Sequence, residues 1–112
     1  MSGPVHTYRT ELTWAGTTAV GYDTYRRDHE VRTPSVGVGL DLSGDAAFRG
    51  DPGRWNPEQL LVAAASSCQL LSFLAVCARA RIDVVAYADE AHGVMPEDAP
   101  PLRPTRTEPP PV

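Results

Sequence analysis

The sequence has 112 residues, of which 42% are hydrophobic and 21% charged, and its net charge is −4 at pH 7. A chain of this length forms one domain at most, and its net charge argues against nucleic-acid binding, which needs a basic face. So short a chain buries only about two-thirds of the surface that it exposes when unfolded, so dimerisation would stabilise it.

The N-terminal residues Met1 to Glu11 are polar and lack the apolar core of a secretory signal. This favours a cytoplasmic, reducing location, where cysteines are usually free, metal-bound or catalytic. The chain has two cysteines, Cys68 and Cys77.

The first predicted strand covers residues 6–14, in which Tyr8 and Trp14 fall on one side of an alternating pattern. Residues 15–18 contain a glycine and two threonines, and they predict a hairpin turn. The turn would lead into a second strand over residues 19–25.

A charged stretch at residues 26–32 is followed by a break at Pro34. Valine then alternates with glycine over residues 35–40, which predicts a third strand lying close to a neighbouring backbone. Residues 41–55 contain three glycines and a proline among acidic residues, and they predict a loop.

A long helix is the clearest element. Asn56 is a favoured N-cap residue, Pro57 occupies the first helical position, and Gln59 stands where a capping box has Glu or Gln. Residues 60–78 carry no charge, so the helix is apolar on nearly every face and is expected to be buried.

A membrane span is the alternative interpretation of this helix, because about 20 apolar residues can cross a bilayer. The alanines within the helix, the polar character of the rest of the chain and four polar helix residues argue for a buried helix without a membrane. These four are Ser66, Ser67, Gln69 and Ser72.

Residues 84–87 are rich in β-branched and aromatic side chains and predict a fourth strand, continuing toward His92. From Pro96 onward proline recurs too often for a sheet or helix to continue. Residues 96–112 are therefore predicted to form an extended or disordered tail.

Cysteine chemistry is the activity that the sequence favours. A thiol attacks a peroxide as the thiolate, so a peroxidatic cysteine requires a nearby cation. Cys68 lies about three turns into the helix, beyond the reach of the helix dipole. Arg26 and Arg27 are the candidate cations, and Glu58 could hold the guanidinium through paired hydrogen bonds.

The helix imposes a constraint on this site. Glu58 and Cys68 are ten residues apart, or about 15 Å along the helix axis. If both serve one site, either the helix breaks or Glu58 comes from a second chain, which favours a homodimer. Cys77 lies about 13 Å beyond Cys68, so the two cannot form a disulfide within an intact helix. Cys77 is predicted to be a buried small hydrophobe.

The chain resembles the OsmC/Ohr family of thiol peroxidases in several separated motifs, over about residues 5–95. The central one is Asn56-Pro57-Glu58-Gln59-Leu60-Leu61 followed by Ala63-Ala64-Ala65-Ser66-Ser67-Cys68. The others are Tyr25-x-Arg27-x-His29-Glu30, Asp45-x-x-Phe48-x-Gly50-Asp51 and Ala86-Tyr87-x-Asp89-x-Ala91-x-Gly93.

The resemblance implies an α+β fold in which an antiparallel sheet is wrapped on a long buried central helix, in an intertwined homodimer with sites at the interface. It also implies reduction of organic hydroperoxides, or of hydrogen peroxide. Cys68 would be the peroxidatic cysteine, Glu58 the carboxylate that positions the arginine, and Arg27 the activating arginine. Arg26 is the alternative if the register is off by one.

The sequence departs from the family at its C-terminal end. The family's resolving cysteine lies on a later helix, beyond the last residue of this sequence. Residues 1–95 would therefore form an incomplete OsmC-like domain without the C-terminal part of the fold. An oxidised Cys68 would need an external thiol reductant, and a sulfenic acid left waiting can over-oxidise.

No metal is expected, because the three histidines show no zinc-ligand spacing with the cysteines. No cofactor is expected either, and the chain has no phosphate-binding glycine loop. The alternative function is a non-catalytic dimeric binding protein on the same scaffold, holding an apolar small molecule near Cys68. A further possibility is a fragment that does not fold stably alone.

Overall fold

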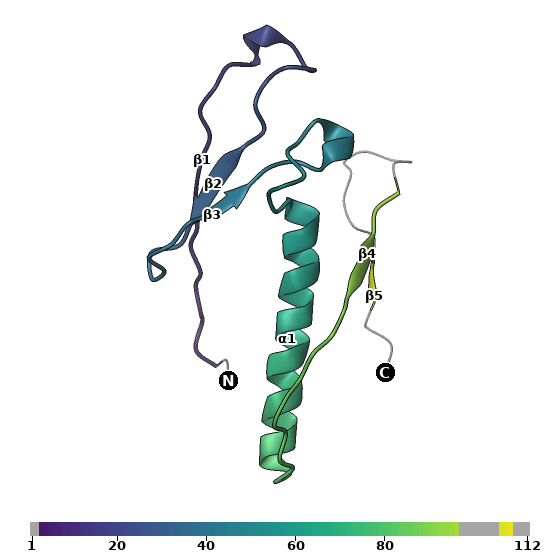
Figure 1. The fold of residues 1–112 in the computed structure, drawn as a ribbon. Coiled ribbons are helices and arrows are strands. Elements are labelled where there is room, and N and C mark those ends of the chain that lie inside the picture. The colour runs from purple at the N-terminus through teal and green to yellow at the C-terminus, as the bar shows by residue number, and fades with distance from the viewer. Residues whose placement is uncertain (1–2, 97–105, 109–112) are drawn as a thin grey trace. The chain divides into compact units, whose positions relative to one another are not determined.

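The computed structural model describes residues 3–96 and 106–108, and the chain divides into two compact units, Met1–Asn56 and Pro57–Val112. The first unit holds a three-stranded antiparallel sheet (Figure 1), in the order β1 (Glu11–Thr13), β2 (His29–Arg32) and β3 (Leu40–Leu42). In this register Leu12 lies opposite Val31, and Glu30 lies opposite Asp41.

The first strand is shorter than predicted, because β1 covers Glu11–Thr13 within the expected residues 6–14. Its partner explains the limit. Glu11 pairs with Arg32, the last residue of β2, and two residues later Pro34 has no N–H to donate. The residues before Glu11 therefore have no strand partner, and the Thr33 hydroxyl donates instead to the Arg9 carbonyl at 2.9 Å.

The predicted hairpin over residues 15–25 is wrong. Thr18–Val20 forms a 3₁₀ helix, η1, in which the Thr17 hydroxyl accepts a hydrogen bond from the Ala19 N–H at 3.1 Å. Such a local bond competes with strand pairing. Gly21 follows with φ 95°, a conformation that favours glycine. The strand that pairs with β1 is instead β2, which lies in the charged stretch of residues 26–32.

The third predicted strand, residues 35–40, is displaced to β3, Leu40–Leu42. A turn in which the Val36 N–H donates to the Thr33 carbonyl occupies its beginning. Gly37 and Gly39 offer no side chains to pack against a neighbouring strand, which weakens strand formation there.

The segment after β3 is mainly loop, as predicted, and it closes on itself. It contains a short 3₁₀ helix, η2 (Ala46–Phe48), whose N-cap is Asp45. Ser43 is fully buried: its N–H donates to the Trp55 carbonyl, and its hydroxyl accepts from the Asp51 N–H at 3.0 Å. These bonds tie the two ends of the loop together immediately before the helix.

The second unit is built on α1, Pro57–Arg79, which begins at the predicted residue (Figure 1). The helix ends in a Schellman motif. The Ile82 N–H donates to the Cys77 carbonyl, the Arg81 N–H donates to the Ala78 carbonyl, and Arg81 adopts φ 61°. The arginine occupies a position where helices usually place glycine.

The chain then returns along α1 without regular structure as far as β4, His92–Val94 (Figure 1). The strand predicted over residues 84–87 is therefore wrong, although its expected continuation toward His92 does reach a strand. Side-chain contacts with the helix replace backbone pairing: the Phe73 and Tyr87 rings lie 5.8 Å apart, and the Ser66 hydroxyl contacts Asp89.

The proline-rich segment contributes one strand. β5, Arg106–Glu108, pairs antiparallel with β4 and occupies the proline-free stretch between Pro104 and Pro109. None of the three strand residues is a proline, so they keep the N–H groups that a short ladder needs. Residues 97–105 and 109–112 of the predicted tail lie outside the described residues.

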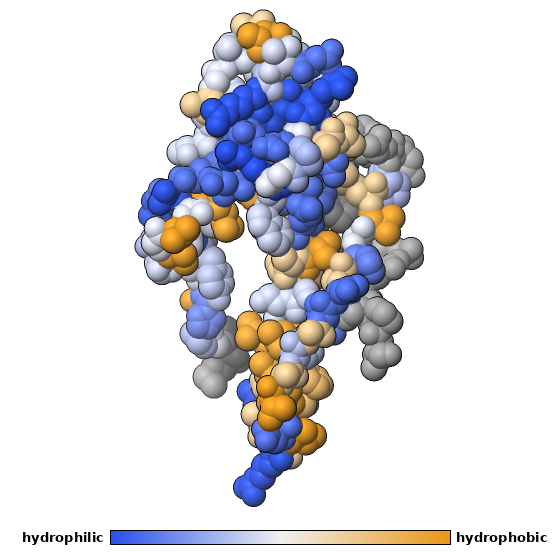
Figure 2. Space-filling model, in the orientation of Figure 1, coloured by the Kyte–Doolittle hydropathy of each residue, from blue (hydrophilic) through white to orange (hydrophobic). Residues whose placement is uncertain are grey.

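Burial within the described residues is sparse. Leu42 and Cys77 are the buried hydrophobic side chains, so the expected burial of the central helix is not achieved within one chain. Figure 2 shows hydrophobic residues gathered along the C-terminal half of α1, and Leu71 and Val76 are more than 60% exposed there. By length and hydropathy α1 could also cross a membrane, a property that it shares with core helices of soluble proteins.

Candidate functional site

The two cysteines occupy different environments on one uninterrupted helix. Both are free; Cys68 is exposed, and Cys77 is buried, with 6% of its surface accessible. The burial of Cys77 confirms its predicted role as a small hydrophobic residue. Because α1 is continuous from Pro57 to Arg79, the nine residues between them correspond to about 13 Å, too far for a disulfide.

Glu58 lies in the first turn of α1, where the helix dipole favours a negative charge. The side chain is half-buried, and its Oε2 atom is buried without a hydrogen-bond partner among the described residues. Buried polar atoms in folded proteins nearly always have a partner. This carboxylate therefore has an oxygen ready to accept a hydrogen bond.

Arg27 belongs to the first unit and is half-buried among neutral groups. Its guanidinium donates to the carbonyl oxygens of Tyr22 and Tyr25. The guanidinium carbon lies 3.5 Å from the centre of the Tyr25 ring and 4.8 Å from that of Tyr22. Within the described part of the chain Arg27 makes no ion pair with a carboxylate, although Asp23 and Asp28 are close in sequence.

Arg26, the alternative cation, has a different environment. Its side chain is 63% exposed and forms a long ion pair with Asp28, at 3.7 Å. Its backbone carbonyl accepts a hydrogen bond from the Trp14 indole at 2.7 Å. Arg26 is therefore already paired with an acid on the surface of its own unit.

An open pocket of about 310 Å³, lined largely by charged residues, lies in the first unit, and sequence reasoning did not predict it. Arg54 lies 3.5 Å from the carboxylate of Asp28 and 3.9 Å from that of Asp41, both of which line the pocket, and 3.7 Å from that of Asp51, which does not. Trp14 and Arg26 also line the pocket. The long ion pairs with Asp28 and Asp41 join segments of the unit that are far apart in sequence.

On β2, Arg32 donates to both carboxylate oxygens of Glu30, at 2.6 and 3.2 Å. These hydrogen bonds lower the pKa of Glu30, and the partial loss of hydration opposes the shift. The same bonds raise the pKa of Arg32. Among the described residues no three His, Cys, Asp or Glu side chains gather as a metal-binding group.

A second polar cluster, also missed from the sequence, lies near Cys68 in the chain. The Ser66 hydroxyl lies 2.7 and 2.8 Å from the two carboxylate oxygens of Asp89, and the Tyr87 hydroxyl donates to Asp89 at 3.3 Å. Tyr87 and Asp89 are two of the residues in the Ala86-to-Gly93 motif. That motif was the available signal, but it did not identify Ser66 as the partner.

The structure thus distributes the predicted site residues over the two units. Glu58 and Cys68 share α1, ten residues apart, whereas Arg27 belongs to the strand-containing unit. Their joint action stays a prediction.

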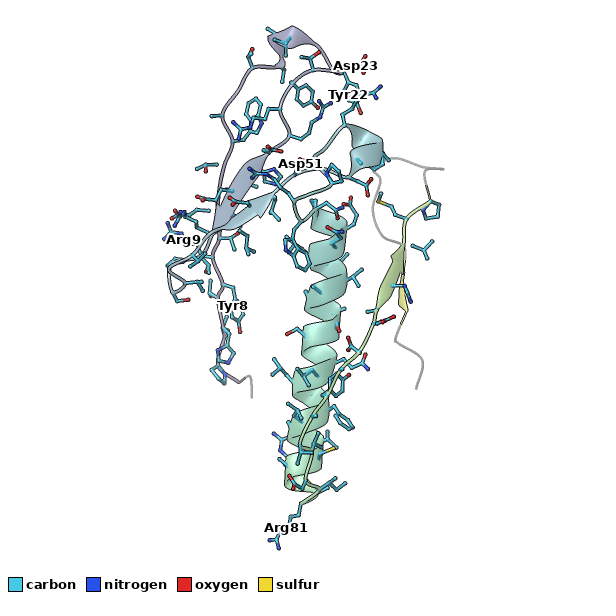
Figure 3. All side chains as sticks on the ribbon, in the orientation of Figure 1. Tyr8, Arg9, Tyr22, Asp23, Asp51 and Arg81 are labelled. Carbon is cyan, nitrogen blue, oxygen red and sulfur yellow. The ribbon has the colours of Figure 1, made fainter. Side chains whose placement is uncertain are left out.

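Figure 3 shows Tyr22 and Asp23 together on the segment that precedes β2, and Arg81 beyond the C-terminal end of α1.

No protein-family model and no curated protein matches this chain. Among solved structures, the chain is similar to an OsmC-like protein of unknown function from Vibrio cholerae, with a TM-score of 0.79 and 24% sequence identity. The similarity covers 92% of this chain and 71% of that one. The antiparallel α+β architecture expected from the sequence is confirmed, and the fold of this chain is that of an OsmC-like protein.

Proposed function

We propose that the chain is a cytoplasmic thiol peroxidase of the OsmC/Ohr type, which reduces organic hydroperoxides or hydrogen peroxide through Cys68. One observation carries the proposal: Glu58 has a buried carboxylate oxygen without a donor, and Arg27 has a guanidinium without a carboxylate, among the residues that the structure describes. Two half-buried, oppositely charged groups that each lack a counter-ion form a natural pair.

Arg27, held by Glu58, would stabilise the thiolate of Cys68, which is exposed to solvent and therefore open to substrate. The thiolate attacks one peroxide oxygen and the O–O bond breaks. The product alcohol, or water from hydrogen peroxide, leaves after taking up a proton, and Cys68 becomes a sulfenic acid. The substrate gains two electrons, and the cysteine sulfur loses two.

An external thiol then attacks the sulfenic acid, releasing water and forming a mixed disulfide, and a second thiol restores Cys68. Cys77 cannot take the first of these roles, because the helix holds it about 13 Å away and buries it.

We also infer that the active species is a homodimer with the site at the interface. Leu61, Leu71, Phe73 and Val76 are 45–63% exposed on α1, an apolar helix that water solvates poorly. Glu58 and Cys68 lie about 15 Å apart on one helix, which is too far for one arginine side chain to contact both. In a dimer, the Glu58 and the Cys68 of one site can come from different chains.

The dimer is tested by melting the protein at two concentrations. If unfolding is coupled to dissociation, a tenfold higher concentration stabilises the dimer by about 1.4 kcal/mol. With about 2.1 cal/mol/K per residue over two chains of 112 residues, the Tm rises by about 3 °C. The dimer would be refuted by a Tm that does not depend on concentration, together with sedimentation that shows a monomer with peroxidase activity.

The peroxidase proposal is tested by intact-mass spectrometry after brief treatment with stoichiometric cumene hydroperoxide, with Cys68→Ser and Cys77→Ser alongside. A rapid gain of about 16 Da that disappears only in Cys68→Ser supports it. Arg27→Met is expected to slow the reaction far more than Arg26→Met. A folded protein oxidised no faster than an ordinary thiol would instead favour the non-catalytic binding protein.

A further inference from the structure

The environment of Arg27 differs from that of every other arginine in its unit. The unit has six arginines, and five of them pair with Asp or Glu side chains: Arg9, Arg26, Arg32, Arg49 and Arg54. Arg27 has neutral partners, two carbonyl oxygens and two tyrosine rings. Asp23, close to it in sequence, pairs with Arg49 at 2.9 Å.

The two rings form a defined cradle. Their centroids are 6.0 Å apart and their planes meet at 82°, so Tyr22 presents its ring at right angles to that of Tyr25. Tyr25 makes the shorter approach to the guanidinium carbon, 3.5 Å against 4.8 Å. A guanidinium held against ring faces keeps its charge, because the attraction comes from the ring quadrupole and transfers no proton.

The cradle orients Arg27 without neutralising it. A guanidinium has five N–H donors, of which two are used on the carbonyls of Tyr22 and Tyr25, leaving three. A side chain with about 2 kcal/mol of rotamer entropy is thereby restricted before it meets a carboxylate or a thiolate. A surface ion pair would restrict it equally but would cancel part of its positive field.

We propose that Tyr25, assisted by Tyr22, is a positioning residue for Arg27. Its ring supports the charged guanidinium face, so that the remaining N–H groups are directed at an anionic partner. The inference rests on the proposed function, in which that partner is Glu58 together with the thiolate of Cys68.

The experiment measures the second-order rate of cumene hydroperoxide oxidation of Cys68 between pH 5 and 9, in full-length protein carrying Cys77→Ser. Tyr25→Phe keeps the ring face and is expected to remain within about twofold of the parent. Tyr25→Leu is expected to be about three- to tenfold slower near neutral pH. Tyr22→Leu is expected to show a smaller loss, because its ring lies farther from the guanidinium. Tyr8→Leu, at an 88% exposed tyrosine, is the control.

A structural role alone would lower the rate equally at every pH. A positioning role lowers it most near neutrality and least toward pH 9, where an ordinary thiol is mostly ionised without help. In an Arg27→Met background, Tyr25→Leu should have no additional effect. Should Tyr25→Leu fail to fold, Tyr22→Leu, at the exposed ring of the cradle, takes its place in the pH series and in the Arg27→Met background, with Tyr25→Phe as the control that keeps both rings.

The two proposals fail in different ways. If Cys68 reacts rapidly and depends on Arg27, but Tyr25→Leu matches the parent at every pH, the positioning role is overturned and the peroxidase stands. An additive loss in the Arg27→Met background overturns it as well. If the parent protein itself shows no rapid reaction that depends on Arg27, the peroxidase proposal falls and this inference falls with it.

Discussion

The contact between Ser66 and Asp89 provides a direct test of how the second unit holds together. Residues 82–91 follow α1 and have no regular structure, so side-chain contacts must hold this segment along the helix. The Ser66 hydroxyl lies almost equidistant from the two oxygens of Asp89, at 2.7 and 2.8 Å. A hydroxyl has one proton, so the two distances describe a single shared hydrogen bond to a charged acceptor.

The expected magnitude is that of one such bond. Hydrogen bonds to charged groups contribute about 1.5–3 kcal/mol, and partial exposure of both side chains places this one near the lower limit. Ser66→Ala is expected to lower the free energy of unfolding by about 1–1.5 kcal/mol per chain. Asp89→Asn keeps an amide oxygen as acceptor and should lose less than half of that amount. The weaker bond from Tyr87, at 3.3 Å, remains in Ser66→Ala.

Urea unfolding followed by circular dichroism, at one fixed protein concentration, measures these differences. The matched control is Glu90→Gln, which removes an exposed carboxylate next to Asp89. The double variant Ser66→Ala with Asp89→Ala should lose about 1 kcal/mol less free energy of unfolding than the summed losses of its two single variants. Additive single effects would show that the short contact contributes nothing, and that other contacts, such as that between the Phe73 and Tyr87 rings, hold the segment.

Three further outcomes are expected. Arg81→Gly should raise the free energy of unfolding by about 0.5–1 kcal/mol, since φ 61° strains a side chain, and an unchanged urea midpoint would contradict this. Arg32 lowers the pKa of Glu30, so the pair stabilises the fold at pH values above the ordinary Glu pKa of 4.5 and loses this contribution as the pH falls through the lowered pKa. In an NMR titration, Arg32→Ala should return the pKa of Glu30 toward 4.5. Gly50→Ala should cost about 2 kcal/mol, since its Cβ would lie 1.7 Å from the Gly44 carbonyl oxygen, whereas Gly44→Ala meets its nearest atom at 3.8 Å and should be tolerated in the same melts.

The sequence predicted the helix well because its signals are local. Asn56 and Pro57 mark the start within two adjacent residues, and the uncharged run after them excludes a surface loop. The strands were predicted poorly because a strand also depends on its partner. The charged segment His29–Arg32 becomes β2 through its pairing with both β1 and β3, which no local pattern in that segment indicates.

The candidate site divides in the same way. The spacing of Glu58 and Cys68 was predictable, because an intact helix converts ten residues into a fixed distance. The cradle of Arg27 had a partial signal, since Tyr25 and Arg27 stand together in one of the family motifs, but the turn at residues 22–24 and the bend at Tyr25 were not predicted. Ser66 and Asp89 each stand in a family motif, but nothing indicated that they pair, because 23 residues of helix and irregular chain separate them.

The uninterrupted helix also determines how the two cysteines can take part in oxidation. Cys68 is exposed, so a hydroperoxide or a reducing thiol can reach it. Cys77 is buried near the end of the helix, where its carbonyl accepts a hydrogen bond of the Schellman motif. Oxidation at Cys68 therefore cannot be relayed to Cys77 without unwinding more than two turns of α1. If Cys68 is peroxidatic as proposed, its sulfenic acid would persist until a thiol other than Cys77 arrives, and the concentration of that thiol would set how much Cys68 proceeds to the irreversible sulfinic acid. If Arg27 accelerates the first oxidation, excess peroxide and scarce thiol would inactivate this chain faster than a variant that lacks Arg27, since formation of the sulfenic acid precedes the damage.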